Sequence, residues 1–295
     1  MVAEYFKTHR VCEEHKNRIE KIRREREHTL SSHAFSSLYL WQYAMGLSLE
    51  LAEDFFSVKC GMDGDNSWFF PCGDEQKVFD FICDHIQDDS FSLCYVRETD
   101  VKWLEEKFPG KWKFNRIEEC DEYICDVSEY ISLEGSKFSE IRRKIRKLDK
   151  EYKITSKIIT DTNIADAMTV VSLWNDVSHN ISEQNLTDEQ IAETALAQRK
   201  LLDISGIILY ADGLPVSVFA GFPLSDDTVD VLIGKCVPDA PRGTVYYGLR
   251  EYLKLCASEY KYCNHEEDLG IPGIRQIKSS LCPVSKTPIW EAVLT

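Results

Sequence analysis

The strongest constraint on the fold of this chain is an order of predicted strands and helices that occurs twice. The first half reads as three strands, a helix and a strand, at 48–53, 55–60, 67–72, 74–87 and 91–96. The second half reads as the same series, at 206–211, 216–222, 228–235, 244–259 and 261–264. Alternating apolar residues indicate the strands, and apolar residues three and four apart indicate the helices. The repeat predicts a duplicated domain of the α+β (mixed α/β) class, with domains at 1–150 and 151–295.

The composition fits a globular protein with two cores. The chain has 295 residues, of which 43% are hydrophobic and 29% charged, and this suffices for two domains of ordinary size. It contains no apolar run with the length of a signal peptide or of a membrane-spanning helix. We therefore expect a cytoplasmic protein without an integral membrane segment.

Cysteines and other short motifs favour no metal or nucleophile chemistry. The eleven cysteines include no CxxC pair, which argues against a disulfide framework and a structural zinc site. The closest grouping, Cys256 with Cys263 and His265, lacks the paired spacing of zinc ligands, so we expect no metal. The GxSxG and P-loop motifs are also absent. Classical hydrolase and nucleotide-triphosphatase activities are therefore disfavoured.

A basic run, EIRRKIRKLDK at 140–150, stands out in a chain whose formal net charge is -15. On a helix, the apolar side chains of this region share one face and pack inward, which leaves the basic ones on the other face. One interpretation is a solvated face that pairs with acidic side chains. The other is a surface that binds phosphates of tRNA, an anionic lipid or a cofactor. The candidates for phosphate contact are Arg142, Arg143, Arg146 and Lys147.

A second dense cluster, NHEEDLGIPGIRQIKSS at 264–280, joins a predicted strand to a predicted helix. Ligands of open α/β sheets bind where strands end and helices begin. Carboxylates there can hold an ammonium group or act as a general base, and basic side chains can hold a carboxylate or phosphate. The alternative is an internal set of salt bridges that fixes the loop. The candidate bases are Glu266, Glu267 and Asp268, and the candidate binding residues are Asn264, Arg275 and Lys278.

Four stretches of the chain are similar to one known family. They are LWQYAMGL, FPGKWKFNRIEECDEYICDVSEYISLEGSKFSEIRRKIRKL, ILYADGLPVSVFAGF and NHEEDLGIPGIRQIKSSLCP, within residues 35–290. They resemble the tandem-GNAT family related to the catalytic domain of phosphatidylglycerol lysyltransferase. The resemblance implies two tandem GNAT-like (acyl-CoA N-acyltransferase) domains that transfer an acyl or aminoacyl group to an amine or hydroxyl of a small-molecule acceptor. One carboxylate of the 266–268 run would then be the base, and backbone N–H groups near Gly243, or Arg275, would stabilise the oxyanion.

The segment that would hold the acyl donor departs from the pattern of ordinary GNAT enzymes. Those enzymes place an Arg/Gln-x-x-Gly-x-Gly/Ala loop at a helix N-terminus, where backbone N–H groups hold the pyrophosphate of coenzyme A. The corresponding segments here are PCGDEQK and KCVPDAPRGTVYYG, which lack the full signature. Arg242 and Gly243 either bind phosphate or only start a helix. The resemblance leaves an acyl-CoA and a charged tRNA open as donors, and the competing hypothesis is a non-catalytic binding module that kept the fold.

Overall fold

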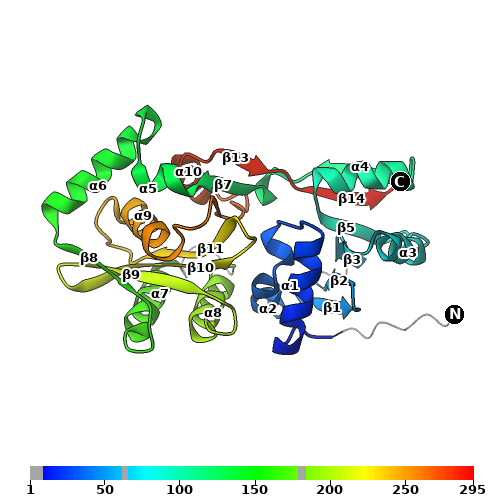
Figure 1. The fold of residues 1–295 in the computed structure, drawn as a ribbon, viewed down its shortest axis with the longest axis horizontal. Coiled ribbons are helices and arrows are strands. Elements are labelled where there is room, and N and C mark those ends of the chain that lie inside the picture. Colours follow the sequence, from blue (N-terminus) through cyan, green and yellow to red (C-terminus); the bar gives the residue numbers. More distant parts are fainter. Residues whose placement is uncertain (1–8, 62–65, 179–183) are drawn as a thin grey trace. The chain divides into compact units, whose positions relative to one another are not determined.

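The computed structural model describes residues 9–61, 66–178 and 184–295 (Figure 1). Contacts divide the chain into two compact units. Unit 1 is Met1–Glu122 with Thr287–Thr295, and unit 2 is Tyr123–Lys286. Within the described residues, no helix combines the length and the apolar character needed to cross a bilayer.

Unit 1 contains a mixed sheet with helices packed against it. Its strands are β1 (Ser48–Leu51), β2 (Phe55–Cys60), β3 (Asn66–Phe69), β4 (Cys72–Gly73), β5 (Phe91–Val96), β6 (Trp112–Arg116) and β14 (Trp290–Leu294). Its helices are α1 (Lys16–Glu25), α2 (Phe35–Trp41), α3 (Glu75–His85) and α4 (Glu98–Lys107). The strand order is β1-β2-β3-β5-β14-β6, with β4 paired to β2. Strands β3 and β5 are parallel and are connected through α3, and the core beside them is rich in aromatic side chains such as Phe81, Phe91 and Trp112.

Unit 2 contains the second sheet. Its strands are β7 (Glu122–Asp126), β8 (Ile154–Ile158), β9 (Ser205–Ala211), β10 (Leu214–Pro223), β11 (Thr228–Cys236), β12 (Tyr262–Asn264) and β13 (Ser285–Thr287). Its helices are α5 (Val127–Ser132), α6 (Ser139–Glu151), α7 (Ile164–Ser178), α8 (Gln184–Ala197), α9 (Thr244–Cys256) and α10 (Pro272–Ser280). The strand order is β13-β7-β12-β11-β10-β9-β8. Figure 1 shows α9 on one face of this sheet and α7 and α8 on the other.

The two sheets repeat one arrangement and exchange one strand. Each has an antiparallel set followed by a parallel pair joined through a helix, which is β3-α3-β5 in unit 1 and β11-α9-β12 in unit 2. The next strand in each sheet comes from the other half of the chain: β14, red in Figure 1, lies between β5 and β6, and β7 lies between β12 and β13. The predicted repeat of mixed strands and helices is therefore present.

The boundary between the units differs from the predicted junction near residue 150. Contacts place it between Glu122 and Tyr123, and they return Thr287–Thr295 to unit 1. The order of strands along the sequence predicted a domain boundary after the basic helix. The sheet to which a strand belongs depends instead on the strands with which it pairs. Strand β7 pairs antiparallel with β12, and β14 pairs antiparallel with β5 and β6. Hence 123–150 belongs to unit 2.

Candidate functional site

Strands β11 and β12 of unit 2 part shortly after they begin to pair. Their parallel ladder joins Thr228 to Tyr262, Val229 to Cys263 and Asp230 to Asn264, and β12 then ends. Strand β11 continues to Cys236, and its 231–236 stretch has no ladder partner on this side within the described residues. Open α/β sheets bind ligands at the carboxyl ends of parallel strands. We call this parting of β11 and β12 the fork.

Close backbone packing fixes the start of the fork. Asp230 and Asn264 are both fully buried. On the other side of β11, a β-bulge interrupts the register of β10 between Ala220 and Phe222. The glycine within that bulge, Gly221, has no room for a side chain, because a Cβ atom there would lie 1.7 Å from the carbonyl oxygen of Asp230. The bulge can form here only because residue 221 is glycine.

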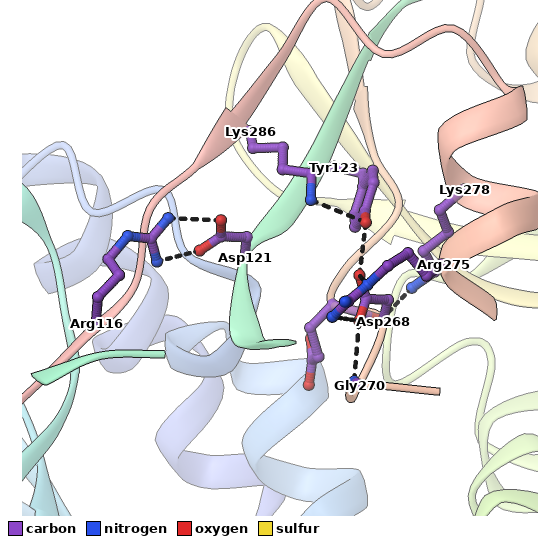
Figure 2. Close-up of polar contacts among 9 residues, drawn as sticks. Arg116, Asp121, Tyr123, Asp268, Gly270, Arg275, Lys278 and Lys286 are labelled. Atoms are coloured by element: carbon purple, nitrogen blue, oxygen red, sulfur yellow. Dashed lines mark hydrogen bonds and ion pairs between the residues drawn. The ribbon is translucent and has the colours of Figure 1, made fainter. Parts of the chain in front are cut away.

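The loop that follows β12 is organised around the carboxylate of Asp268 (Figure 2). Arg275 donates to both carboxylate oxygens, at 2.9 Å from Nε and 2.8 Å from a terminal nitrogen. The hydroxyl of Tyr123 donates to Oδ2 at 2.5 Å, and the backbone N–H of Gly270 donates to Oδ1 at 2.9 Å. The side chain of Asp268 is 0% exposed, whereas that of Arg275 is 48% exposed. A buried carboxylate therefore holds a guanidinium that solvent can reach.

This environment determines the protonation of Asp268. The hydrogen bond from Arg275, with those from Tyr123 and Gly270, holds the pKa of the carboxyl well below its usual range despite burial. The carboxylate is consequently ionised at neutral pH, and each of its oxygens already accepts hydrogen bonds. A general base works best with a pKa near the operating pH. Asp268 thus fits an anchoring role, and the two other candidate bases of the run are Glu266 and Glu267.

The other residues predicted for this cluster gather around the same loop. The side-chain oxygen of Asn264 accepts from the backbone N–H of Glu266 at 2.8 Å. Glu266 has a positive φ of 55°, which is uncommon for a residue other than glycine. Lys278 donates from its ammonium group to the carbonyl oxygen of Glu267. Glu266 and Glu267 are half-buried.

Two residues of this network had no signal in the sequence. Lys286 donates to the hydroxyl of Tyr123 at 2.9 Å, and its ammonium group lies 4.0 Å from the centre of the Tyr123 ring. Tyr123 is buried on β7, and Lys286 lies on β13. Both strands flank the loop only because β7 pairs with β12, a pairing that local periodicity does not reveal.

Most of the side chains of the basic helix α6 that were predicted to contact phosphate form hydrogen bonds or ion pairs with other groups of the protein. The guanidinium of Arg142 donates to the carbonyl oxygens of Leu133 and Gly135. Arg143 forms an ion pair with Glu140 at 2.6 Å, and Lys147 forms one with Glu151 at 3.6 Å. Arg146 is exposed and makes no hydrogen bond or ion pair with any described residue. The inward face is as predicted, since Phe138, Ile141, Ile145 and Leu148 are all buried.

Helix α6 also approaches the start of α9, where a coenzyme A pyrophosphate would bind in an ordinary GNAT enzyme. Gly243 caps α9 with a φ of 106°, and a Cβ atom there would lie 2.9 Å from the carbonyl oxygen of Lys144. The ammonium group of Lys144 lies 3.1 Å from the Tyr246 hydroxyl. Arg242 is exposed. A backbone carbonyl next to this helix N-terminus is unfavourable for a phosphate.

Comparison with known proteins identifies the family. A profile described as "Phosphatidylglycerol lysyltransferase, C-terminal" matches residues 23–292. The chain belongs to this family. Its two similar units are tandem GNAT-like domains, which confirms the predicted fold class. No curated protein matches the chain significantly.

Solved structures of other proteins have a similar fold. A conserved protein of unknown function from Bacteroides thetaiotaomicron superposes with a TM-score of 0.90 at 22% identity, covering 98% of this chain and 100% of that one. L-PGS from Bacillus licheniformis gives a TM-score of 0.65 at 13% identity, covering 94% and 91%. The C-terminal domain of a putative lysylphosphatidylglycerol synthetase from Agrobacterium fabrum gives 0.64 at 13% identity, covering 95% and 91%.

Proposed function

We propose that this protein transfers an aminoacyl or other acyl group to an amine or hydroxyl acceptor at the fork of unit 2. The observation that carries the proposal is the position of the carboxylate-rich loop directly after β12, where the parallel ladder ends. The family supports it, because relatives of this fold are named as lysyltransferases and lysylphosphatidylglycerol synthetases. Fold alone would not suffice for an activity.

The residues around the fork can supply each requirement of acyl transfer. The acceptor attacks the carbonyl carbon of an ester or thioester, and Glu266 or Glu267 takes its proton. The tetrahedral oxyanion then receives hydrogen bonds from backbone N–H groups of β11 beyond Asp230, where the ladder with β12 has ended. The oxyanion collapses, the bond from the carbonyl carbon to the donor's oxygen or sulfur breaks, and the leaving group takes the proton back from the glutamic acid to depart as an alcohol or thiol. Arg275, held by Asp268, orients an anionic part of a substrate.

We propose a charged tRNA as the donor in preference to an acyl-CoA. The approach of Lys144 to Gly243 crowds the helix start at which a pyrophosphate would bind. The exposed side chains of Arg143, Arg146 and Lys147 on α6 offer a local contact for tRNA phosphates, although the net charge of -15 argues against an extended nucleic-acid surface. A charged-tRNA donor would place the reaction in the cytoplasm.

A transfer assay tests this function. The protein is incubated with total aminoacyl-tRNA carrying radiolabelled amino acids, or with labelled acetyl-coenzyme A, in the presence of phosphatidylglycerol vesicles or primary amines. We expect label to move from tRNA to an acceptor, and we expect Glu266→Gln or Glu267→Gln to abolish the transfer. Glu134→Gln, an exposed carboxylate of unit 2 outside the loop, is the matched control and should retain it. Ligand binding without transfer from any donor would favour the non-catalytic module.

A further inference from the structure

Three potential metal ligands that are distant in sequence meet inside unit 2. Cys125 on β7 is the direct antiparallel partner of Cys263 on β12. His265 follows Cys263 by two positions, so its side chain lies on the same face. The Sγ atom of Cys263 is 3.4 Å from Nε2 of His265, and the ligand atoms of all three residues lie within 4.8 Å of one another.

The separation of Cys263 and His265 is close to the spacing of two ligands around one small ion. Zinc binds thiolate sulfur at about 2.3 Å and imidazole nitrogen at about 2.0–2.1 Å in a tetrahedron. Those bond lengths place sulfur and nitrogen about 3.6 Å apart, and two sulfurs about 3.8 Å apart. The observed 3.4 Å therefore needs only a small adjustment.

Polar side chains most often gather at a solvent-exposed surface, but these three are buried. Cys125 is 1% exposed, Cys263 0% and His265 7%. The two cysteines belong to the same core cluster as Tyr130, Phe138 and Leu281. The thiol of Cys125 donates to the carbonyl oxygen of Leu281 at 3.8 Å.

We infer that Cys125, Cys263 and His265 bind one zinc ion that fastens β7 to β12. The ion would join the strand that comes from the first half of the chain to the strand that leads into the carboxylate-rich loop. The expectation of no metal site, drawn from sequence spacing, considered Cys263 and His265 but could not supply Cys125. The inference does not depend on the transfer activity, because metal content is measured without a substrate.

Metal analysis of the purified protein tests the site. The protein is prepared with a reductant and without chelators, incubated with excess Zn²⁺, and freed of unbound ion by gel filtration. We expect about one zinc per chain by elemental mass spectrometry, and less than about a tenth of that in Cys125→Ser and His265→Gln. Cys72→Ser, which changes a cysteine of matched burial in unit 1, should retain the full zinc content.

A second measurement on the unaltered protein guards against variants that fail to fold. With Co²⁺ in place of zinc, we expect a thiolate charge-transfer band and the visible bands of tetrahedral cobalt. Absence of these bands, or a wild-type zinc content no higher than that of the ligand variants, would overturn the inference. Peptide mapping that finds a disulfide between Cys125 and Cys263 in the protein purified with a reductant would also overturn it and would assign the pair to thiol oxidation.

Discussion

The hydroxyl of Tyr123 donates to the buried carboxylate of Asp268 at 2.5 Å across 145 positions of sequence. Tyr123 reaches this place on β7, the strand that precedes the basic helix and pairs with β12. The loop of unit 2 that carries the candidate site is therefore held by a residue from the first half of the chain.

Removing this hydroxyl should destabilise unit 2. In Tyr123→Phe, Asp268 loses a donor and Lys286 loses an acceptor, so we expect the free energy of unfolding to fall by about 1.5–3 kcal/mol. Urea denaturation followed by circular dichroism measures the change. Tyr43→Phe, at a side chain that is 72% exposed, is the control and should change it by less than about 0.5 kcal/mol. A similar small change in Tyr123→Phe would show that the hydroxyl adds nothing.

The stability conferred by Asp268 should depend on pH only in acid. Its folded-state pKa lies below the unfolded value of about 3.9, so its contribution is complete above that value and is lost as the pH falls through the folded pKa. Wild type should therefore exceed Asp268→Asn by a constant about 1–3 kcal/mol between pH 5 and pH 8, and the gap should shrink below about pH 4. Urea unfolding at stepped pH measures it. A gap that changes between pH 6 and pH 8 would instead assign Asp268 a pKa suited to a base.

Two glycines should respond oppositely to the addition of one methyl group. In Gly221→Ala the new Cβ would meet the carbonyl oxygen of Asp230 at 1.7 Å, so we expect a loss of at least about 2 kcal/mol. In Gly273→Ala nothing lies within 4 Å of the new Cβ, and the residue is in helix α10, so we expect a gain of about 0.5–1 kcal/mol. Thermal and urea unfolding of both variants provide the comparison. Equal effects would mean that the bulge of β10 can relax away from β11.

Reversing one charge on α6 should weaken binding of a polyanion without loss of fold. Arg146→Glu breaks no hydrogen bond or ion pair among the described residues, so the melting temperature should stay within about 1 °C. Affinity for tRNA should fall. The plot of the logarithm of the binding constant against the logarithm of the salt concentration should become shallower, with a slope smaller in magnitude by about one to two units. Lys102→Glu, an equal change of charge on α4 of unit 1, is the control. If both variants weaken binding equally, α6 is not a specific contact.

Truncation after Lys286 should open the sheet of unit 1. It removes β14, which pairs with β5 and with β6. We expect amide hydrogen exchange at 91–96 and 112–116 to lose its protection, while strands β9 to β11 keep theirs. Mass spectrometry of exchanged peptides resolves these segments. Retained protection at 91–96 would show that unit 1 holds its sheet without the C-terminal strand.

Local chemistry made part of this structure predictable. Asp74 precedes the apolar pattern of α3 and caps it, accepting from the backbone N–H groups of Gln76 and Lys77 at 3.0 and 3.3 Å. The inward face of α6 follows from helical periodicity in the same way. Asn264, Glu266–Asp268, Arg275 and Lys278 come together because they are neighbours along one strand, loop and helix.

The remainder depends on pairing between distant segments. Local periodicity shows that 122–126 and 290–294 are strands, but it does not state which sheet each one joins. The assignment of Tyr123, Cys125 and Lys286 to their partners needs that information. Because these pairings were not known from the sequence, the domain junction was predicted near residue 150.

The exchange of β7 and β14 also sets an order for assembly on the ribosome. Every strand of the second sheet, from β7 to β13, has been synthesised before β14 is made. Domains usually fold as units with the N-terminal one first. Here the first unit must wait for Thr287–Thr295, which are made after every strand of the second sheet, so the unit that begins later can finish its sheet earlier.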